Sequence, residues 1–421
     1  MNGAPSFGEA VRVWAKIGVT SFGGPAGQIA LMHRVLVEER RWLDEQHYLH
    51  ALNFCMLLPG PEAMQLATYA GWLLHGWRGG LVAGLLFVLP GAVIVVALSA
   101  AYAAFGAAPI AAALFLGVKA AVLAIVVEAL LRIARRALKR RLDWVIAGAA
   151  FCALFLFAVP FPAIVLGAAL IGFVALRPKE EGPSAATPRV PLAATMGRAA
   201  LWLVLWWAPL ALLALGPSRL LVDVGLFFSK LAVVTFGGAY AVLSYMAQQA
   251  VELHGWLSPA AMIDGLGLAE TTPGPLILVT AFVAYQAGFG AAGHGLGLAA
   301  AMVALWATFV PCFLWIFVGA PYIERLRGAA RLRGALAAIT AAVVGVILNL
   351  SLWFALHVVF AAVETRDLGP LRLAVPNPAS LDAAALALVV IAAVLLLAFK
   401  LGVLRTLAAC AALGIGWSLL A

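Results

Sequence analysis

The sequence predicts an all-α polytopic membrane protein of two inverted homologous halves, with helices broken at Phe-Gly-Gly and Pro-Gly-Pro motifs. Of 421 residues, 65% are hydrophobic and 11% are charged, whereas soluble domains carry about 25% charged residues. No Asp, Glu, Lys or Arg occurs in residues 79–118, 271–323 or 334–363. Each run exceeds the roughly 20 residues that a membrane-spanning helix needs.

The clearest break is Leu58-Pro59-Gly60-Pro61-Glu62-Ala63-Met64-Gln65, between two apolar segments. Each proline removes a backbone donor and disfavours helical geometry in the residue before it. Non-helical backbone at membrane depth persists only where protein or a water-filled cavity covers it. The break recurs as Thr272-Pro273-Gly274-Pro275, so we expect a broken helix in each half.

The two halves align with a constant offset of 214 residues over their first parts. Matched pairs are Glu9 with Asp223, Lys16 with Lys230, Ser21-Phe22-Gly23-Gly24 with Thr235-Phe236-Gly237-Gly238, Glu38 with Glu252, and Pro59-Gly60-Pro61 with Pro273-Gly274-Pro275. Further along, Pro90 aligns with Pro311. We therefore predict a first transporter half (1–176), a cytoplasmic linker (177–198), an unmatched linking transmembrane helix (199–218) and a second half (219–421).

Hydropathy gives the expected order of elements. We expect a segment Phe7–Leu36 interrupted at Ser21–Gly27, a polar loop Val37–Gln46, full spans at Leu81–Phe105 and Pro109–Leu131, two short spans or a hairpin over Trp144–Leu176, and an apolar helix over Ala199–Gly216. The first apolar segment carries charges, so we expect no cleavable signal peptide.

The loops predict opposite orientations for the two halves. In half one the basic loop 132–141 follows the second full span, and the uncharged loop 106–109 precedes it. In half two, Arg325, Arg327, Arg331 and Arg333 precede the corresponding span, and the mixed loop 364–382 follows it. Because basic loops face the cytoplasm, the halves insert upside down relative to each other. Inverted repeats with discontinuous helices are typical of secondary transporters.

Several other functions are disfavoured. The net charge of +9 arises from short basic loops and does not indicate nucleic-acid binding. The cysteines, Cys55, Cys152, Cys312 and Cys410, show no pairing or metal pattern, and His47 and His50 have no further ligand nearby. We expect no metal, no cofactor and no enzymatic activity, because catalytic motifs are absent from the sequence.

The breaks are candidates for binding an anion. A helix that starts after a break presents unpaired N–H groups and a partial positive charge, which suits an oxyanion. The candidate groups are Ser21, Gly23, Gly24, Pro59, Gly60, Pro61, Thr235, Gly237, Gly238, Thr272, Pro273, Gly274 and Pro275. The alternative is that the glycines only permit close helix crossing and the prolines only end helices.

Charged residues near the breaks supply further candidates. Lys16 and Lys230 each precede a Phe-Gly-Gly motif and follow an acid, Glu9 or Asp223, on the same helix face. They attract an anion or, alternatively, extend to the membrane interface. Because an intramembrane charge is costly, an acid partner or a bound anion would offset it.

The first break also carries Glu62, a proton carrier or a helix cap, and Gln65, an oxyanion donor or an interhelical hydrogen-bonding group. Lys119 and Glu128 lie in a full span, where they line the pathway or mark its ends. The coupling candidates are thus Glu9, Glu62, Asp223, Lys119 and Glu128.

Ser21-Phe22-Gly23-Gly24-Pro25 and the segment 58–69, with their second-half equivalents, make the chain resemble the two-domain form of the chromate ion transporter family. The resemblance covers both halves. It implies a multi-pass protein of the bacterial inner membrane that exports chromate, driven by the proton-motive force, and so confers chromate resistance. It also implies that sulfate competes with chromate. The oligomeric state is left open, with a homodimer as one candidate. Transport of sulfate or another oxyanion, a membrane-embedded reductase and a passive anion channel are the alternatives. The second half departs from the pattern at Ala239, opposite Pro25, and at Leu276, opposite Glu62.

Overall fold

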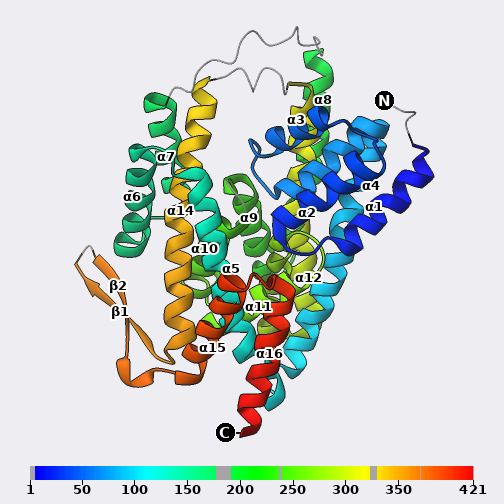
Figure 1. Cartoon of the computed structure of the whole chain (residues 1–421). Helices are drawn as coiled ribbons and strands as arrows, with labels where there is room; N and C mark the ends of the chain where they lie inside the picture. The colour runs from blue at the N-terminus through cyan, green and yellow to red at the C-terminus, as the bar shows by residue number, and fades with distance from the viewer. Residues whose placement is uncertain (1–4, 177–190, 237–238, 323–329, 370, 421) are drawn as a thin grey trace. The chain divides into compact units, whose positions relative to one another are not determined.

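The computed structural model describes residues 5–176, 191–236, 239–322, 330–369 and 371–420, which are mainly helical (Figure 1). Six of the described helices are long and apolar enough to cross a membrane. They are Glu62–Phe105, Pro109–Ala137, Leu192–Ala214, Leu276–Gly319, Ala330–Val359 and Val403–Leu420. The predicted class, a helical multi-pass membrane protein, is confirmed.

The chain divides into two compact units, and each draws segments from both halves of the sequence. Unit one comprises Met1–Ala100, Lys179–Ala239 and Thr272–Ala330. Unit two comprises Ala101–Pro178, Tyr240–Thr271 and Arg331–Ala421. Both breaks, at Pro59–Pro61 and Pro273–Pro275, therefore fall in unit one.

Unit one contains two long, kinked helices, α4 and α12, together with shorter ones. Its elements are α1 (Phe7–Thr20), α2 (Gly24–His33), η1 (Arg34–Glu39), α3 (Glu45–Cys55), most of α4 (Glu62–Phe105), α8 (Leu192–Ala214), α9 (Arg219–Val234), η3 (Leu276–Leu278), α12 (Val279–Gly319) and η4 (Ala320–Tyr322). α4 bends at His75–Gly76 and α12 at Ala292–Gly293, where the backbone leaves helical geometry.

The second segments of α4 and α12 pack in opposite directions. Gly80 of α4 lies against Phe317 of α12, and Gly84, one turn later in α4, lies against Phe313, one turn earlier in α12. Equivalent segments of the two halves thus run antiparallel, as inverted repeats require.

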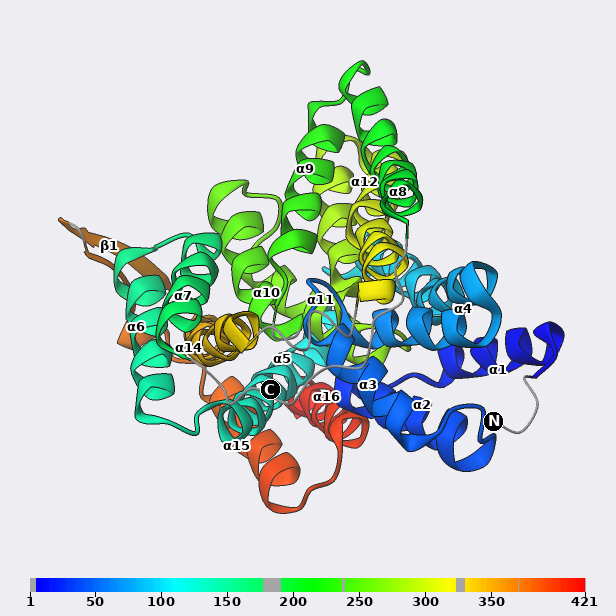
Figure 2. The ribbon, with the colours of Figure 1, turned by 90° about the horizontal axis from the view of Figure 1, so that it is seen from above.

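Unit two contains the second full span of each half, α5 and α14, together with shorter helices. Its elements are the end of α4, α5 (Pro109–Ala137), α6 (Arg141–Phe157), α7 (Phe161–Ala175), α10 (Ala239–Ala247), η2 (Gln248–Leu253), α11 (Pro259–Thr271), α14 (Ala330–Val359), α15 (Ala383–Ala393), η6 (Val394–Ala398) and α16 (Val403–Leu420). The undecided segment 144–176 forms two helices, α6 and α7. Both lie beside α14 (Figure 2). A Cβ on Gly345 of α14 would lie 2.1 Å from the Ala147 carbonyl oxygen, and a Cβ on Gly334 would lie 2.0 Å from the Leu176 carbonyl oxygen.

Two regions differ from the sequence prediction. The mixed loop 364–382 contains an antiparallel hairpin of β1 (Val363–Leu368) and β2 (Leu371–Pro376), followed by η5 (Pro378–Ser380). Gly369 adopts a φ of 65° in its turn, which glycine tolerates at no steric cost. α8 begins at Leu192, seven residues before the predicted apolar segment, within what was expected to be linker. Residues 177–190, Arg325 and Arg327 lie outside the described part.

Candidate functional site

The two breaks of unit one are joined by a reciprocal pair of backbone hydrogen bonds. The Gly60 N–H donates to the Thr235 carbonyl at 2.8 Å, and the Gly274 N–H donates to the Ser21 carbonyl at 2.9 Å. Each Pro-Gly-Pro glycine thus satisfies the carbonyl at the end of a helix from the other half, α9 or α1. The two halves therefore cross at this point of unit one, where each Pro-Gly-Pro break meets a helix end of the other half.

The glycines of the two breaks adopt backbone conformations that other residues rarely adopt. φ is +116° at Gly60 and +95° at Gly274. A Cβ on Gly60 would lie 2.9 Å from Gln65 Nε2 and 3.1 Å from Cys312 Sγ. A Cβ on Gly274 would lie 2.9 Å from Leu278 Cδ1. Both the left-handed backbone and the limited space therefore favour glycine.

The proline-containing parts of the long helices cover the breaks in a matched way. A Cβ on Gly91, which follows Pro90 in α4, would lie 2.1 Å from the Pro273 carbonyl oxygen. In α12 the residue after Pro311 is Cys312, and it lies against Gly60. Each long helix therefore packs on the break of the other half.

Two buried glutamines bond to the backbone at the breaks. Gln28 Nε2 of α2 donates to the Gly274 carbonyl at 2.6 Å and to the Ser21 carbonyl at 3.4 Å. Gln65 Nε2 of α4 donates to the Pro59 carbonyl at 2.6 Å. The Oε1 atoms of both side chains accept no hydrogen bond within the described residues. Gln65 is thus a buried polar group with unused acceptor capacity, and its amide nitrogen bonds to the backbone in this conformation.

The hydroxyl groups beside the Phe-Gly-Gly motifs are also engaged. Ser21 Oγ donates to the Ile17 carbonyl and Thr235 Oγ1 to the Leu231 carbonyl, each four residues earlier. Both side chains are buried, as is Thr272. In this conformation the Ser21 and Thr235 hydroxyls close the ends of α1 and α9, and their protons point along their own helices.

The first Phe-Gly-Gly motif opens α2. Gly23 is its N-cap with φ +86°, and Gly24 follows with φ +67°. No side chain caps this end by a hydrogen bond, so its first N–H groups retain donor capacity. The equivalent Gly237 and Gly238 lie outside the described residues.

The prolines of the breaks cannot donate a hydrogen bond to an anion, because Pro59, Pro61, Pro273 and Pro275 have no N–H group. Glu62 is the first residue of α4, and its side chain is half-buried. A carboxylate there is favourably placed for the helix dipole.

The predicted lysines lie on the exposed faces of the helices that lead to the breaks. α1 buries Ala10, Val13, Trp14, Ile17 and Gly18, and Lys16 is exposed. Lys230 and Asp223 of α9 are exposed as well. Glu9 forms its ion pair with Arg40, at 2.9 Å from Nη1.

A network at the other end of α2 ties the first Phe-Gly-Gly helix to α3. His33 Nε2 lies 2.7 Å from Glu45 Oε2, and its Nδ1 lies 3.1 Å from Glu38 Oε1. The hydrogen bond with Glu45 is the main cause that raises the pKa of His33. The charged imidazolium is thereby favoured, and it links the end of α2 to the start of α3.

The two remaining candidates, Lys119 and Glu128, belong to unit two and have acid and base partners there. Lys119 Nζ lies 3.5 Å from Asp264 Oδ1. Asp264 Oδ2 also accepts a hydrogen bond from Tyr102 at 2.9 Å. Glu128 pairs with Arg132 one turn later on α5.

A second buried carboxylate of α11, Glu270, accepts a hydrogen bond from Tyr240 at 2.6 Å. Asp264 and Glu270 were not predicted. Their positions in half one hold His50 and Met56, so a search for residues repeated in both halves passes over them. The available signal was a pair of acids on an apolar helix directly before the second break.

The family comparison decides what this architecture belongs to. The family model described as "Chromate transporter" matches residues 8–173 and 222–415. The chain belongs to the chromate transporter family. Each matched segment contains one Phe-Gly-Gly and one Pro-Gly-Pro motif.

Three relatives named as chromate transport proteins agree with this membership. The chain is 33% identical over 357 residues to a "Chromate transport protein" of Pseudomonas aeruginosa, covering 81% of this chain and 79% of the relative. It is 30% identical over 349 residues to the "Chromate transport protein" of Cupriavidus metallidurans, covering 80% of each. A "Probable chromate transport protein" of Synechococcus elongatus is 30% identical over 330 residues, covering 76% of this chain and 78% of the relative. No solved structure matches the chain.

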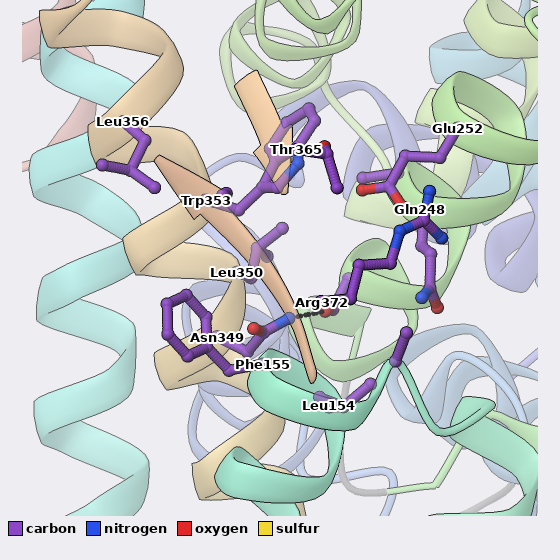
Figure 3. A pocket seen from close by; sticks show the side chains of 14 residues that line it. Leu154, Phe155, Gln248, Glu252, Asn349, Leu350, Trp353, Leu356, Thr365 and Arg372 are labelled. Carbon is purple, nitrogen blue, oxygen red and sulfur yellow. Dashed lines mark hydrogen bonds between the residues drawn. The ribbon is translucent and has the colours of Figure 1, made fainter. Parts of the chain in front are cut away.

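Unit two also holds a small polar cavity that no predicted site residue lines. It has a volume of about 80 Å³ and lies between η2, α14, the end of α6 and the hairpin. Figure 3 shows Arg372 of β2 extending toward Glu252 and Gln248, while Asn349 bonds to Ser244 at 3.5 Å. The cavity thus combines one carboxylate with one guanidinium.

Proposed function

We propose that this chromate transporter family member exports chromate across a bacterial inner membrane, coupled to the proton-motive force, and so confers chromate resistance. The observation that supports it best is the crossed pair of breaks in unit one. The ends of α1 and α9 meet the Pro-Gly-Pro breaks of the opposite halves there, and secondary transporters bind substrate at such a repeat interface.

The proposed anion site is the region of the breaks. An arriving oxyanion competes with the backbone carbonyls for the amide groups of Gln28 and Gln65, and the uncapped start of α2 adds N–H donors and a partial positive charge. Lys16 and Lys230, on the exposed faces of α1 and α9, attract the anion toward this region. The site is electrostatically suited to a divalent tetrahedral ion.

Alternating access is the proposed cycle, but the two sequence halves are not its moving bodies. Movement of one half against the other would break the Gly60–Thr235 and Gly274–Ser21 hydrogen bonds, which lie inside unit one. We therefore propose that this crossed region stays together through the cycle, while its side-chain contacts exchange for those of the anion.

Growth of chromate-sensitive bacteria that express the transporter tests the named site. We expect Lys16→Ala and Glu62→Gln to lower chromate tolerance at equal membrane expression, since one removes an attracting charge and the other removes the carboxylate that stabilises the start of α4 at the break. Arg12→Ala, on an exposed position of the same helix as Lys16, is the matched control and is expected to keep tolerance. Full tolerance in the Lys16 variant would refute the role of that lysine.

The oxyanion itself is identified by competition. Sulfate, molybdate and phosphate are added in excess to vesicles that take up labelled chromate. Chromate as the cargo predicts that sulfate, which has the same charge and shape, competes more weakly than unlabelled chromate. Stronger competition by sulfate would make sulfate the cargo.

A further inference from the structure

Unit two contains an acid–base cluster whose geometry is suited to binding a proton. Asp264 of α11 is 4% exposed. Its Oδ2 accepts a hydrogen bond from Tyr102, while its Oδ1 accepts none within the described part of the chain. Lys119 Nζ faces that second oxygen at 3.5 Å. The carboxylate is therefore buried, incompletely hydrogen-bonded and balanced by one cation at ion-pair distance.

Close helix packing brings the two charged groups together. A Cβ on Gly267, one turn after Asp264, would lie 2.2 Å from Val118 Cγ1. Glycine at this position lets α11 approach α5 beside Lys119. The pair is thus fixed by the packing of two helices and not by a mobile loop.

The groups facing Asp264 come from the elements packed on α11. α5 contributes Lys119 and the end of α4 contributes Tyr102. α16 also packs on α11, and its one charged residue, Arg405, is exposed. Further along α11, Glu270 accepts a hydrogen bond from Tyr240. The paired charges of Arg132 and Glu128 on α5 interact electrostatically with the Glu270 carboxylate.

A permanent buried ion pair would contribute little to stability, because desolvation of both charges offsets their attraction. Ionisable residues within membrane-embedded cores are costly and commonly mark ion or proton pathways. Protonation at the unsatisfied Oδ1 forms one O–H bond, removes the negative charge and releases Lys119 from the pair. Loss of the proton restores the pair.

We propose that Asp264, held by Lys119 and Tyr102, is the carboxylate that binds the coupling proton during transport. The inference rests on the proposed proton-coupled export. It assigns the proton to unit two, apart from the break residues to which the anion is assigned, and it names an acid partner for Lys119.

The test uses the purified full-length transporter in proteoliposomes with two measurements. Chromate–chromate exchange without a gradient reports anion binding and translocation. Chromate accumulation under an imposed pH gradient, recorded with a pH-sensitive dye inside the vesicles, reports coupling. We expect Asp264→Asn to retain exchange and to lose both gradient-driven accumulation and the accompanying proton flux.

Two further variants separate a proton-binding role from a structural one. Asp143→Asn is the matched control, because Asp143 is also a buried carboxylate of unit two but accepts from the backbone N–H groups of Lys139 and Arg140; coupling should persist. The double variant Asp264→Asn/Lys119→Gln removes both charges of the pair, so that no unpaired charge is left behind. A structural ion pair predicts that this double variant recovers accumulation, whereas the proposal predicts that it does not.

The Asp264→Glu variant covers the case in which Asp264→Asn fails to fold. It keeps a titratable group in altered geometry, so we expect accumulation with a shifted pH midpoint. An unshifted midpoint, or gradient-driven accumulation in Asp264→Asn equal to that of the wild type, would overturn the proposal. If the wild type itself moves chromate without protons, the proposed coupling fails first, and the role of Asp264 fails with it.

Discussion

At the scale of single residues, the crossed arrangement depends on two backbone hydrogen bonds, which Gly60 and Gly274 donate to carbonyls at the ends of α9 and α1. Two prolines around a glycine are incompatible with a continuous helix, so their place could be read directly. That Gly60 and Gly274 donate to Thr235 and Ser21 depends on contacts between halves 214 residues apart in sequence. A local sequence pattern contains no information on such contacts. We expected the N–H groups at these glycines to be unpaired, whereas each donates to a backbone carbonyl of the other half.

The same reasoning explains the glutamines and the acids. Gln65 stood in the motif and was predicted, whereas Gln28, whose half-two position holds Val242, was not. Asp264 and Glu270 likewise lack counterparts. A search by internal symmetry finds what the halves share and misses what only one of them carries, and the buried side chains of Gln28, Asp264 and Glu270 are of the second kind.

Replacement of the break glycines tests the crossed arrangement at this scale. Gly60→Ala and Gly274→Ala each place a Cβ at positive φ and against a neighbour less than 3 Å away. We expect each to lower stability by roughly 1–2 kcal/mol from the left-handed backbone alone, and more from the contact. The measurement is thermal unfolding in detergent.

Gly148→Ala on α6 is the control for these substitutions. Its added Cβ would meet nothing within 4 Å, so a neutral effect or a slight stabilisation is expected. Equal thermal stability of all three variants would show that the glycines do not adopt the described conformations.

At the scale of elements, helices were predicted best where composition alone decides. The spans at 81–105 and 109–131 appear within α4 and α5, and the proline pair at 160 and 162 separates α6 from α7. The hairpin β1–β2 was missed, because the charged residues of segment 364–382 are typical of a loop.

Helix packing in unit two gives a prediction at this scale. Gly117 of α5 lies so close to α16 that a Cβ there would be 1.8 Å from the Cys410 carbonyl oxygen. Gly117→Ala therefore forces the two helices apart, and we expect a loss of about 1–3 kcal/mol, typical of overpacking. Gly416→Ala on α16, with open space around its Cβ, should leave unfolding unchanged. Equal effects of the two substitutions would contradict the α5–α16 contact.

At the scale of the whole molecule, the repeat and the family could be read from sequence, and the composition of the compact units could not. Each unit mixes segments from both halves, because α4 and α12 contribute to one unit and α5 and α14 to the other. The grouping of the helices depends on side-chain packing between distant segments, such as that of Gly80 against Phe317.

The inverted orientation predicts a labelling pattern. In a variant whose four cysteines are replaced, single cysteines at Arg136 and Arg331 should react only from the cytoplasmic side, since both lie in basic segments at helix ends, Arg136 at the end of α5 and Arg331 at the start of α14. Cysteines at Ala107 and Asp367, all four positions being exposed, should react with a membrane-impermeant thiol reagent added to intact cells. Labelling of Arg136 and Ala107 from the same side would exclude the proposed topology.

The central claim, proton-coupled chromate export by this family member, is tested most directly by uptake of labelled chromate into inverted membrane vesicles. Export in the cell corresponds to uptake here. With an acidic vesicle interior, we predict accumulation above the external concentration, and collapse of the gradient by a protonophore should abolish it. Uptake that only equilibrates chromate, or that is the same with and without the gradient, would contradict the claim.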